Sequence, residues 1–593
     1  MSDTVRIGCA SGFWGDTELA AAQLVYHGDI HYLVFDYLAE ITMSLLIRAR
    51  MKDPKQGYAP DFVASMKPLL KELKARGIKV ISNAGGVNPS ACREALAAAA
   101  AAEGVDLKIA AVNGDDLMPQ VEALRAAGVT EMFSGAAFPT QIMSANAYLG
   151  AQPIAAALAA GADIVVTGRC VDSAVALAPL IHHFGWQATD YDRLAQGSLA
   201  GHLIECGPQT TGGNYTDWDK VPGWDNMGFP IAECRSDGSF ILTKPEGTGG
   251  LVCPSSVGEQ MLYEIGDPRA YILPDVICDL TQVTLTQDGP DRVLVQGARG
   301  RPPTDVCKVS VTYMDGFRAL SVFMIGGIDA AQKAERSGTA LLTRCRRIFA
   351  ERGWGDFTEV SVEVLGAEAT YGPHARAVTR EVLLKIGVRH TSKAALEFFA
   401  REVAPSALAS APAITGFFGG RPKVQPVIRL FSCVWPKERI PVSVEVGGTP
   451  VPCAPMTGQP FDAASLPGVG GPLPAADAFA RGRRTVPLVR LAWGRSGDKG
   501  DAANIGIIAR RAEYLPYIRA ALTEQAVADY FAHAVKGPVL RYDLPGILAL
   551  NFLMHEALGG GGIASVRIDP QAKAFAQMLL DFPVPVPADL GLH

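Results

Sequence analysis

The chain lacks the features that direct a protein into a membrane or the secretory pathway. No stretch approaches the roughly 20 consecutive apolar residues that a membrane-spanning helix needs, and residues 1–19 contain no uncharged apolar segment of the signal-peptide type. Residues 95–102 are alanine-rich but short, which is typical of a packed helix. We therefore expect a cytoplasmic protein with no membrane partner.

Cysteine pairs and excess positive charge are missing as well. The 11 cysteines include no C-x-x-C pair, and their odd number suggests reduced thiols more than disulfides or zinc ligands. The net charge of −6 gives no support to nucleic-acid binding. We expect neither a bound metal nor a nucleic-acid partner.

Several cofactor and nucleophile motifs are also absent. The glycine-rich turns match neither the dinucleotide fingerprint nor the Walker A loop, and the chain has no lysine motif for pyridoxal phosphate and no biotinyl Met-Lys-Met. We therefore expect no covalently bound cofactor. A hydrolase that uses Cys206 or Ser173 as its nucleophile is one possible interpretation of the sequence. The chain contains no Gly-x-Ser-x-Gly elbow that would support it.

What the sequence does contain is a series of strands that alternate with helices. With 593 residues, 48% of them hydrophobic and 19% charged, the chain is long enough for two or three globular domains. A polar turn and a helix follow each of five short apolar segments, at residues 5–9, 32–35, 79–82, 108–112 and 164–167. This pattern predicts an α/β fold with a largely parallel sheet and flanking helices. The polar turns would then meet at the carboxyl ends of the strands, where such sheets bind ligands.

Acidic residues and one histidine in these turns are candidates for acid/base catalysis. Asp36 and Glu40 lie where a strand gives way to a helix, but acids there are equally explained by the helix dipole. Asp172 stands with Ser173 at a predicted helix start. His202 and Glu205 are three residues apart, so they would share a helix face, and His202 could equally be a structural histidine. The catalytic candidates are therefore Asp36, Glu40, Asp172, His202 and Glu205.

Glycine, amide and hydroxyl groups in the same turns are candidates for ligand binding. Helix N-termini offer free N–H groups to anions, and Arg169 would add a fixed charge with two parallel donors. Polar connections that need glycine only for turning would look similar. The candidates are Ser11, Gly12, Trp14, Asn83, Gly85, Gly86, Asn88, Asn113, Asp115, Thr167, Gly168, Arg169, Gly212 and Gly213.

The second half of the chain has a different residue pattern, which predicts a different arrangement of secondary structure. Alternating segments at 276–285, 292–297 and 308–313 predict antiparallel strands in an α+β middle portion, and residues 455–484 have the Pro/Gly-rich composition of a linker. In the last part we expect a two-layer α+β sandwich, with a helix at 547–558 and a strand at 564–568. Its motif at 495–500 resembles a backbone nest that could bind an oxyanion, which adds the candidates Arg495, Ser496 and Lys499; the alternative is a charged hairpin.

These motifs together resemble the acyclic terpene utilisation protein A family. The residues that carry the resemblance are Gly12-Phe13-Trp14-Gly15-Asp16, Asp36-Tyr37-Leu38-Ala39-Glu40, Asn83-Ala84-Gly85-Gly86-Val87-Asn88-Pro89, Thr167-Gly168-Arg169, Gly201-His202-Leu203-Ile204-Glu205-Cys206-Gly207, Thr211-Gly212-Gly213, Arg495-Ser496-Gly497-Asp498-Lys499-Gly500 and Asn504-Ile505-Gly506. The resemblance implies a core domain over residues 1–454, with an α/β part at 1–218 and an α+β part at 219–454. It also implies that residues 485–593 form a ferredoxin-like domain.

The resemblance further implies a role in the catabolism of acyclic terpenols or related branched acyl-CoA compounds. We expect an enzyme of the lyase or hydratase type that acts on an acyl-CoA thioester, with coenzyme A as part of the substrate. The alternative is a non-catalytic binding or assembly component of an acyl-CoA carboxylase pathway, for which a small tail domain on a linker would suit a docking role. A homo-oligomer is the base-rate expectation.

Overall fold

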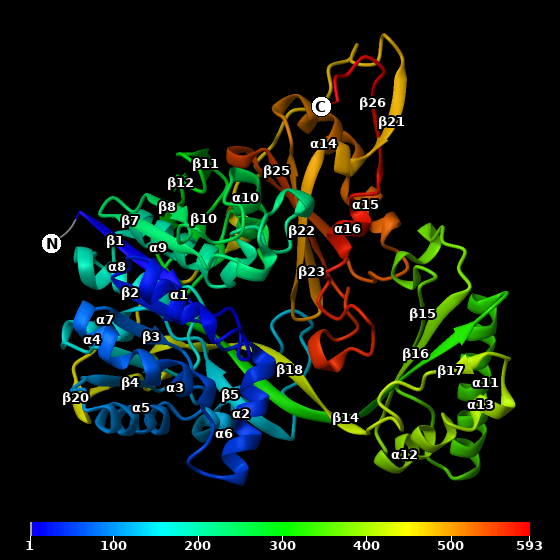
Figure 1. Ribbon diagram of the computed structural model, residues 1–593, viewed down its shortest axis with the longest axis horizontal. Coiled ribbons are helices and arrows are strands. Elements are labelled where there is room, and N and C mark those ends of the chain that lie inside the picture. Colours follow the sequence, from blue (N-terminus) through cyan, green and yellow to red (C-terminus); the bar gives the residue numbers. More distant parts are fainter. Residues whose placement is uncertain (1–2, 593) are drawn as a thin grey trace.

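The computed structural model describes residues 3–592, apart from the side chains of Glu40 and Ile41. Three parts are visible in Figure 1: an N-terminal body built on one large sheet, a lobe that extends from it, and a C-terminal domain that sits above both. The architecture is a mixed sheet with a parallel core, an antiparallel middle sheet and a small antiparallel sandwich. The predicted fold class is confirmed.

The large sheet has eleven strands in the order β11-β12-β8-β7-β1-β2-β3-β6-β4-β19-β20. Its five central strands are parallel and are those predicted from the sequence: β1 (Thr4–Cys9), β2 (Tyr32–Phe35), β3 (Lys79–Ser82), β6 (Ile164–Thr167) and β4 (Ile109–Asn113). Antiparallel strands extend both edges: β7 (Ile231–Arg235), β8 (Phe240–Thr243), β12 (Val293–Gln296) and β11 (Thr284–Gln287) beside β1, and β19 (Ser443–Val446) and β20 (Thr449–Val451) beside β4. Strands from before and after residue 218 therefore share one sheet.

Helices cover both faces of the parallel core, because its strands are apolar on both sides. Leu33 and Val34, neighbours in β2, belong to two different hydrophobic clusters. One face packs against α1 (Leu19–His27), α3 (Pro60–Met66), α4 (Leu70–Arg76) and α5 (Pro89–Glu103), and the other against α7 (Gln152–Ala159), α8 (Ala174–Phe184) and α9 (Tyr191–Ile204). The remaining helices of this body are α2 (Glu40–Lys52), α6 (Val121–Ala126) and α10 (Pro254–Leu262).

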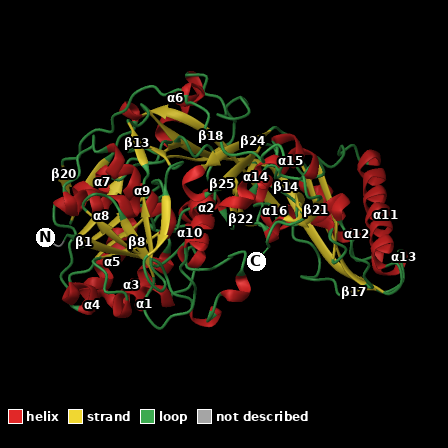
Figure 2. Ribbon diagram, turned by 90° about the horizontal axis from the view of Figure 1, so that it is seen from above, coloured by secondary structure: helices red, strands yellow, loops and turns green. Residues whose placement is uncertain are grey.

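The lobe is built around the 21-residue strand β14 (Val306–Gly326). Near the body this strand pairs with β5 (Ile142–Ala147) and β18 (Gln425–Pro436), and farther out with β16 (Glu381–His390) and β17 (Ile414–Thr415). Figure 2 shows β14 leading away from the body to the far end of the molecule, where α11 (Ala330–Glu351) and α13 (Ser406–Ala409) lie. The lobe also contains β15 (Glu359–Leu365) and α12 (Lys393–Glu402), while β9 (Tyr271–Ile272), β10 (Ile277–Asp279) and β13 (Arg299–Arg301) form a small separate sheet.

The C-terminal domain has a four-stranded antiparallel sheet in the order β22-β23-β25-β24. Residues 455–482, most of the predicted linker, contain one short 3₁₀ helix, Ala463–Ser465, and β21 begins at Arg483, inside the predicted linker. The elements of the domain are β21 (Arg483–Pro487), β22 (Ala492–Lys499), β23 (Ala502–Ala509), α14 (Leu515–Ala521), α15 (Glu524–Tyr530), β24 (Val539–Leu544), β25 (Ala549–Met554), α16 (Phe575–Leu579) and β26 (Pro583–Pro587).

Two predicted elements of this domain are wrong. Residues 547–558 were expected to be helical, but Ala549–Met554 form β25 between β23 and β24, because a short apolar run suits a doubly buried strand as well as a helix. The strand expected at 564–568 is absent from the described structure. In this segment, backbone carbonyl groups that would bond to a neighbouring strand accept hydrogen bonds from side chains of the lobe instead. Arg318 donates to the oxygen of Ile563, and Lys385 donates to the oxygen of Val566.

The helix after β3 is capped by Asn88, whose side chain accepts from the Ala91 N–H at 3.4 Å. A smaller expectation differs in the C-terminal domain. The motif at 495–500 is mostly extended as β22 and not a nest, and the chain turns only at Gly500. Within residues 3–592, no helix has both the length and the apolar composition needed to cross a membrane.

Candidate functional site

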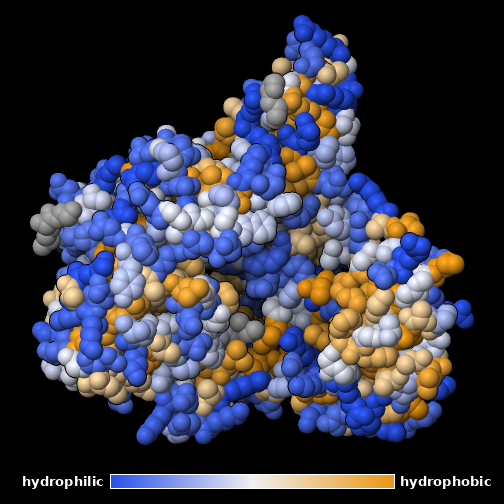
Figure 3. All heavy atoms as spheres, viewed as in Figure 1, coloured by the Kyte–Doolittle hydropathy of each residue, from blue (hydrophilic) through white to orange (hydrophobic). Residues whose placement is uncertain are grey.

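Turns from separate strands meet at the carboxyl ends of the parallel core, an edge that we call the rim. Asp36 follows β2, and its carboxylate oxygen Oδ1 accepts a hydrogen bond from the Asn83 amide, which follows β3. Ser11, after β1, donates through its hydroxyl to the backbone oxygen of Asp36 at 3.2 Å. Three turns far apart in the sequence are thus bonded to one another, as parallel strands predict. The space-filling view shows a hydrophilic hollow at the centre of the molecule, where the body, the lobe and the C-terminal domain approach each other (Figure 3).

Two glycines allow the end of α9 to come against this rim. A β-carbon at Gly201 would lie 2.6 Å from the backbone oxygen of Ser173, so α9 touches the start of α8 closely. A β-carbon at Gly12 would lie 3.0 Å from the carbonyl carbon of Cys206, just beyond α9. Bulkier residues at these points would separate the segments. The close packing explains how the cluster around 201–207 joins the turn at 167–173.

Arg169 is held rigidly beneath the rim. Its guanidinium donates to the Asp172 carboxylate at 2.7 Å and to the Cys170 carbonyl, and it stacks over the ring of Tyr148 at 4.1 Å. Its backbone N–H donates to Asp115, which also accepts from the Asn146 amide. Burial raises the pKa of Asp115 to about 6, although both donors oppose the shift. Arg169 therefore supplies a fixed, buried positive charge among the carboxyl groups.

His202 and Glu205 form a buried pair at the end of α9. Nδ1 of His202 lies 3.1 Å from Oε1 of Glu205, and Nε2 lies 3.3 Å from the backbone oxygen of Met261. A carbonyl oxygen only accepts hydrogen bonds, so Nε2 carries the proton of a neutral ring and Nδ1 is left with a lone pair. The contact with Glu205 is then a hydrogen bond only if the Glu205 carboxyl is protonated and donates.

The electrostatics of the pair agree with this proton arrangement. Burial, followed by the charge of Lys499, lowers the pKa of His202 to about 4 and keeps its ring neutral. Burial, followed by the nearby charges of Asp172 and Glu264, raises the pKa of Glu205 well above its usual range. Glu205 also stands at the C-cap of α9, where the negative end of the helix dipole disfavours a carboxylate. Both effects favour the protonated form of Glu205.

Asp36 is a second carboxyl in an unusual state. It is 7% exposed, and burial, followed by the charges of Asp172 and Glu205, raises its pKa well above the ordinary value. Arg169 and the hydrogen bond from Asn83 act in the opposite direction. The rim thus places two carboxyls with raised pKa beside an Arg169–Asp172 ion pair. Perturbed carboxyls grouped in this way are characteristic of sites that transfer protons.

Comparison with known protein families gives two matches. The profile of the acyclic terpene utilisation family protein AtuA matches residues 5–446. The chain belongs to this family. The profile of the AtuA ferredoxin-like domain matches residues 486–585, which contain the four-stranded sheet of the C-terminal domain. No curated protein and no solved structure matches the chain.

The family's glycine-rich motifs are divided between the rim and other places in this chain. Ser11, Gly12, Asn83, Asp115, Gly168 and Arg169 lie in the rim turns with Asp36 and Asp172, and Thr167 ends β6. His202 and Glu205 lie at the end of α9, which packs against these turns. Trp14 instead donates to Asp61, Asn88 caps α5, and Asn113 is paired with Ser443 of β19. Gly85 and Gly86 continue the turn after β3, where a β-carbon on Gly85 would lie 2.6 Å from the Thr167 oxygen. The side chain of Glu40 lies outside the described residues.

The remaining candidates lie where this AtuA-family core meets its tail. Arg495 donates to the carbonyl oxygen of Gly213, next to Gly212, and the Ser496 hydroxyl bonds to the backbone of Ala572 and Ala576. Ligand binding by these residues stays a prediction, and their observed contacts are with the protein itself. Lys499 is exposed at the end of β22.

Residues that the sequence analysis did not select also shape the site. Tyr148 lies under Arg169, the ring of Tyr271 meets that of His202 at 5.7 Å, and the charge of Glu264 acts on the pKa of both His202 and Glu205. Glu264 has a left-handed backbone, with φ of 59°, which is uncommon for glutamate. None of these residues stands in a glycine-rich motif, so no local signal selected them. Among the described residues, no group of three His, Cys, Asp or Glu side chains is arranged to hold a metal ion.

Buried polar atoms without partners gather on the same segments. Thr167 Oγ1, Ser173 Oγ, Thr210 Oγ1 and Glu205 Oε2 form no hydrogen bond with any described residue. A buried polar atom left unsatisfied costs about 1–3 kcal/mol, so such a group is unusual in a purely structural core. These atoms are suited to bind polar groups of a ligand.

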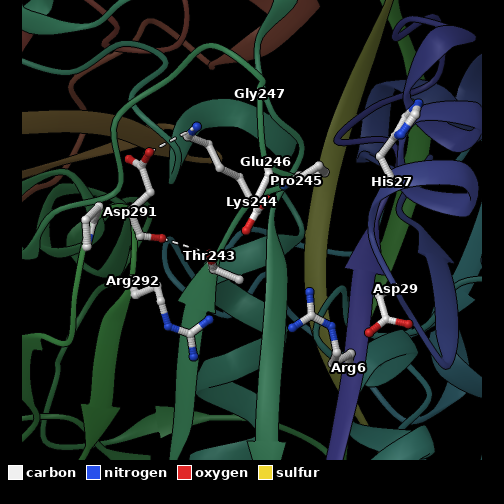
Figure 4. A pocket seen from close by; sticks show the side chains of 11 residues that line it. Arg6, His27, Asp29, Thr243, Lys244, Pro245, Glu246, Gly247, Asp291 and Arg292 are labelled. Carbon is white, nitrogen blue, oxygen red and sulfur yellow. Dashed lines mark hydrogen bonds and ion pairs between the residues drawn. The ribbon is translucent and has the colours of Figure 1, made fainter.

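A cavity of about 550 Å³ elsewhere on the body is a poorer candidate. It is lined by charged residues from β1, from the end of α1 and from the loops beside β8 and β12 (Figure 4). Its cations already have partners, since Arg6 and Arg292 both pair with Glu233, and Lys244 pairs with Asp291 at 3.1 Å. None of the rim residues lines it, so substitutions of its lining residues are suitable controls for substitutions at the rim.

Replacing Gly201 by Ala tests the packing that brings α9 to the rim. Alanine is preferred over glycine in a helix by about 1 kcal/mol, but the new methyl group would meet the backbone of Ser173, and such overpacking costs about 1–3 kcal/mol. We expect a net loss of stability, measured as a lower denaturation midpoint. Gly197→Ala in the same helix is the control, because the nearest atoms that its methyl group would meet belong to the side chains of Leu177 and Trp186 and not to backbone. Equal midpoints for the two variants would contradict the role given to Gly201.

Proposed function

We propose that the rim is an acid/base site that acts on an acyl-CoA thioester in acyclic terpene catabolism, by hydration, dehydration or carbon–carbon cleavage. The observation that carries the proposal is the buried His202–Glu205 pair, in which Nδ1 lies 3.1 Å from Oε1 of Glu205 and Nε2 lies 3.3 Å from the Met261 carbonyl oxygen. From these contacts we infer that Nε2 carries the ring proton and that Glu205 is the donor to Nδ1. Two carboxyl groups in different surroundings can act as a general acid and a general base. Here Glu205 would donate a proton and Asp36 would accept one.

The chemistry can be written for hydration of an α,β-unsaturated thioester. Asp36, in its ionised form, takes a proton from water as the water oxygen bonds to the β-carbon. The electron pair of the double bond moves to the α-carbon and thioester oxygen, and Glu205 then gives its proton to the α-carbon. Dehydration is the reverse sequence. Arg169, a buried cation, stabilises the negative charge that develops on the thioester oxygen and on the carboxylates.

His202 has a supporting role in this scheme. After Glu205 has lost its proton, the remaining carboxylate stands beside the Nδ1 lone pair of the neutral ring, which is unfavourable. Asp36 returns to its carboxylate form by giving its proton to solvent, and Glu205 takes a proton from solvent, which completes the cycle. The substrate class is supported by membership of the acyclic terpene utilisation family and by the unpartnered hydroxyls on the rim segments, which can bind polar groups of a thioester.

Exchange of hydrogen for deuterium is the most general test. The protein is incubated in heavy water with a panel of saturated and α,β-unsaturated branched acyl-CoA thioesters, and mass spectrometry follows deuterium uptake together with gain or loss of water and chain cleavage. We expect uptake at the carbon beside the thioester with at least one member of the panel. Exchange reports proton transfer even where the full reaction needs a further partner.

An Asp36→Asn variant should lose this exchange, with a fall of about 10²–10⁴-fold for the loss of a general base. Asp29→Asn is the matched control, because Asp29 is exposed and lines the separate cavity (Figure 4). Absence of exchange and of product across the whole panel would overturn the proposal and leave a non-catalytic binding or assembly role.

A further inference from the structure

The C-terminal domain is held on the body by a buried ion pair. Arg495 in β22 donates twice to Glu259 of α10, at 3.0 and 3.2 Å, and also to the Gln209 side chain at 2.9 Å. The Glu259 side chain is completely buried and that of Arg495 is 6% exposed. The part of the domain that carries β21 and β26 points away from the body (Figure 1) and is a narrow projection in the space-filling view (Figure 3). We call these two paired strands the ribbon.

One face of the ribbon is covered by its own domain. Val584 and Val586 of β26 are fully buried in the hydrophobic core of the C-terminal domain, and Val486 of β21 packs against the same core. The ribbon is therefore attached through one face. Its two long edges are each a potential site for a further strand, as strand edges generally are.

The ends of the ribbon show which backbone groups point toward an edge. The N–H of Leu488 donates to the oxygen of Phe582 at 2.9 Å. At the other end, the N–H of Ala588 donates to the oxygen of Gly482 at 3.1 Å. Bonded and unbonded pairs alternate along an antiparallel ladder, so the even-numbered residues of both strands bond to each other. The odd-numbered residues direct their backbone groups to the outer edges.

Proline closes the outer edge of β26. The odd-numbered residues of this strand are Pro583, Pro585 and Pro587, and proline has no N–H group. An edge without donors cannot form the ladder of a further strand, and proteins use edge prolines to prevent such pairing. One edge of the ribbon is therefore blocked by its sequence.

The outer edge of β21 lacks this protection. Arg483 and Thr485 direct their N–H and carbonyl groups outward, and both residues are exposed. Within residues 3–592, β26 is the strand that pairs with β21, and no second one does. The cations beside this edge are already in contact with the chain itself, since Arg483 lies over the ring of Phe479 at 4.4 Å and Arg484 donates to the oxygen of Leu590.

We propose that the open edge of β21 binds the same edge of a second copy of this chain, so that two ribbons form one sheet in the order β26-β21-β21-β26. Antiparallel pairing about a two-fold axis at Thr485 would place this residue opposite the partner's Thr485. Each of the two would then donate to and accept from the other. The inference concerns assembly and does not depend on the acid/base function proposed for the rim.

A second copy fits this edge because the edge is complementary to itself. In the two-fold register Arg483 faces the partner's Pro487, whose oxygen can accept from the Arg483 N–H. Arg484 faces the partner's Val486, so no like charges stand directly opposite, which would be destabilising. The threonine pair at the centre is a favourable cross-strand pair.

The same arrangement explains why pairing would stop at two copies. Joining the two β21 edges leaves the β26 edges on the outside, and both of these carry Pro583, Pro585 and Pro587. A two-fold contact that uses the one open edge of each copy is closed. An edge left open for unrelated strands would not give this limit.

Analytical ultracentrifugation of the full chain over a range of concentrations tests the proposal. We expect the unchanged protein to form a species of twice the mass of a single chain. Thr485→Pro removes the outward N–H at the centre of the pairing and none of the bonds to β26. Because two hydrogen bonds are lost per dimer, the dissociation constant should rise by about tenfold or more. Thr485→Val keeps the N–H and the branched shape, and it should leave the constant nearly unchanged.

Two charged variants test the two-fold geometry itself. Thr485→Lys and Thr485→Glu would each place like charges opposite one another, so each alone should weaken the dimer. An equal mixture of the two should associate again, because opposite charges then face each other. The Thr485 side chain is exposed, so folding should be kept, which circular dichroism verifies. A single-chain species in the unchanged protein, a dimer that persists in Thr485→Pro, or a mixture that associates no better than either charged variant would each overturn the inference.

Discussion

Replacing Glu205 by Gln is expected to lower turnover of an acyl-CoA substrate by about 10²–10⁴-fold, the usual contribution of a general acid. The amide of Gln can still donate to Nδ1 of His202, so the geometry of the pair is kept, but it has no proton to transfer. KM should therefore change little while kcat falls. Steady-state kinetics, or the rate of deuterium exchange, measures the effect.

The same residue predicts the direction of a pH dependence. Because burial and neighbouring acids raise the pKa of Glu205, the protonated acid is present at low pH and is lost as the pH rises through that raised value. Under the proposed function, the unchanged protein should lose activity on that alkaline side, and the residual activity of Glu205→Gln should not. Glu246→Gln, at an exposed position in the separate cavity, is the control for the substitution itself. Turnover in Glu205→Gln within a few-fold of the original would exclude Glu205 as the acid.

The rim could be predicted from the sequence because it depends on local patterns repeated along the chain. Each parallel strand is a short apolar run that ends in a polar turn, and the carboxyl ends of parallel strands necessarily share an edge. That Asp36 and Asn83 are bonded to each other follows from strand order, since β2 and β3 are neighbours in the sheet. The spacing of His202 and Glu205 likewise predicted a shared helix face.

Contacts between distant segments could not be predicted in this way. Arg495 and Glu259 are 236 residues apart, and neither stands in a pattern that identifies the other. The glycine in Arg495-Ser496-Gly497 suggested a turn, whereas its purpose is to let an extended strand approach the ring of Tyr263. The residues next to His202 in the sequence also could not show whether it is structural or functional. Its neutral state depends on burial and on charges from other segments of the chain.

Breaking the Arg495–Glu259 pair should have the largest effect on stability. In Arg495→Met the Glu259 carboxylate would be left buried without its cation, and removal of one partner of a buried pair costs about 3–5 kcal/mol. The hydrogen bonds from Arg495 to Gln209 and Gly213 are lost as well. Denaturant unfolding followed by the fluorescence of Trp493, whose indole bonds to Asp217 across the same interface, should show an early transition.

Arg376→Met is the matched control for this experiment. Its pair with Asp581 also joins the tail to another part of the chain, but the two side chains are 75% and 36% exposed, and such surface pairs contribute about 0–1 kcal/mol. A double variant, Arg495→Met with Glu259→Met, should recover part of the loss, because the unpaired buried charge is removed while the packing volume is kept. If Arg495→Met were no less stable than the control, the tail would not be anchored by this pair.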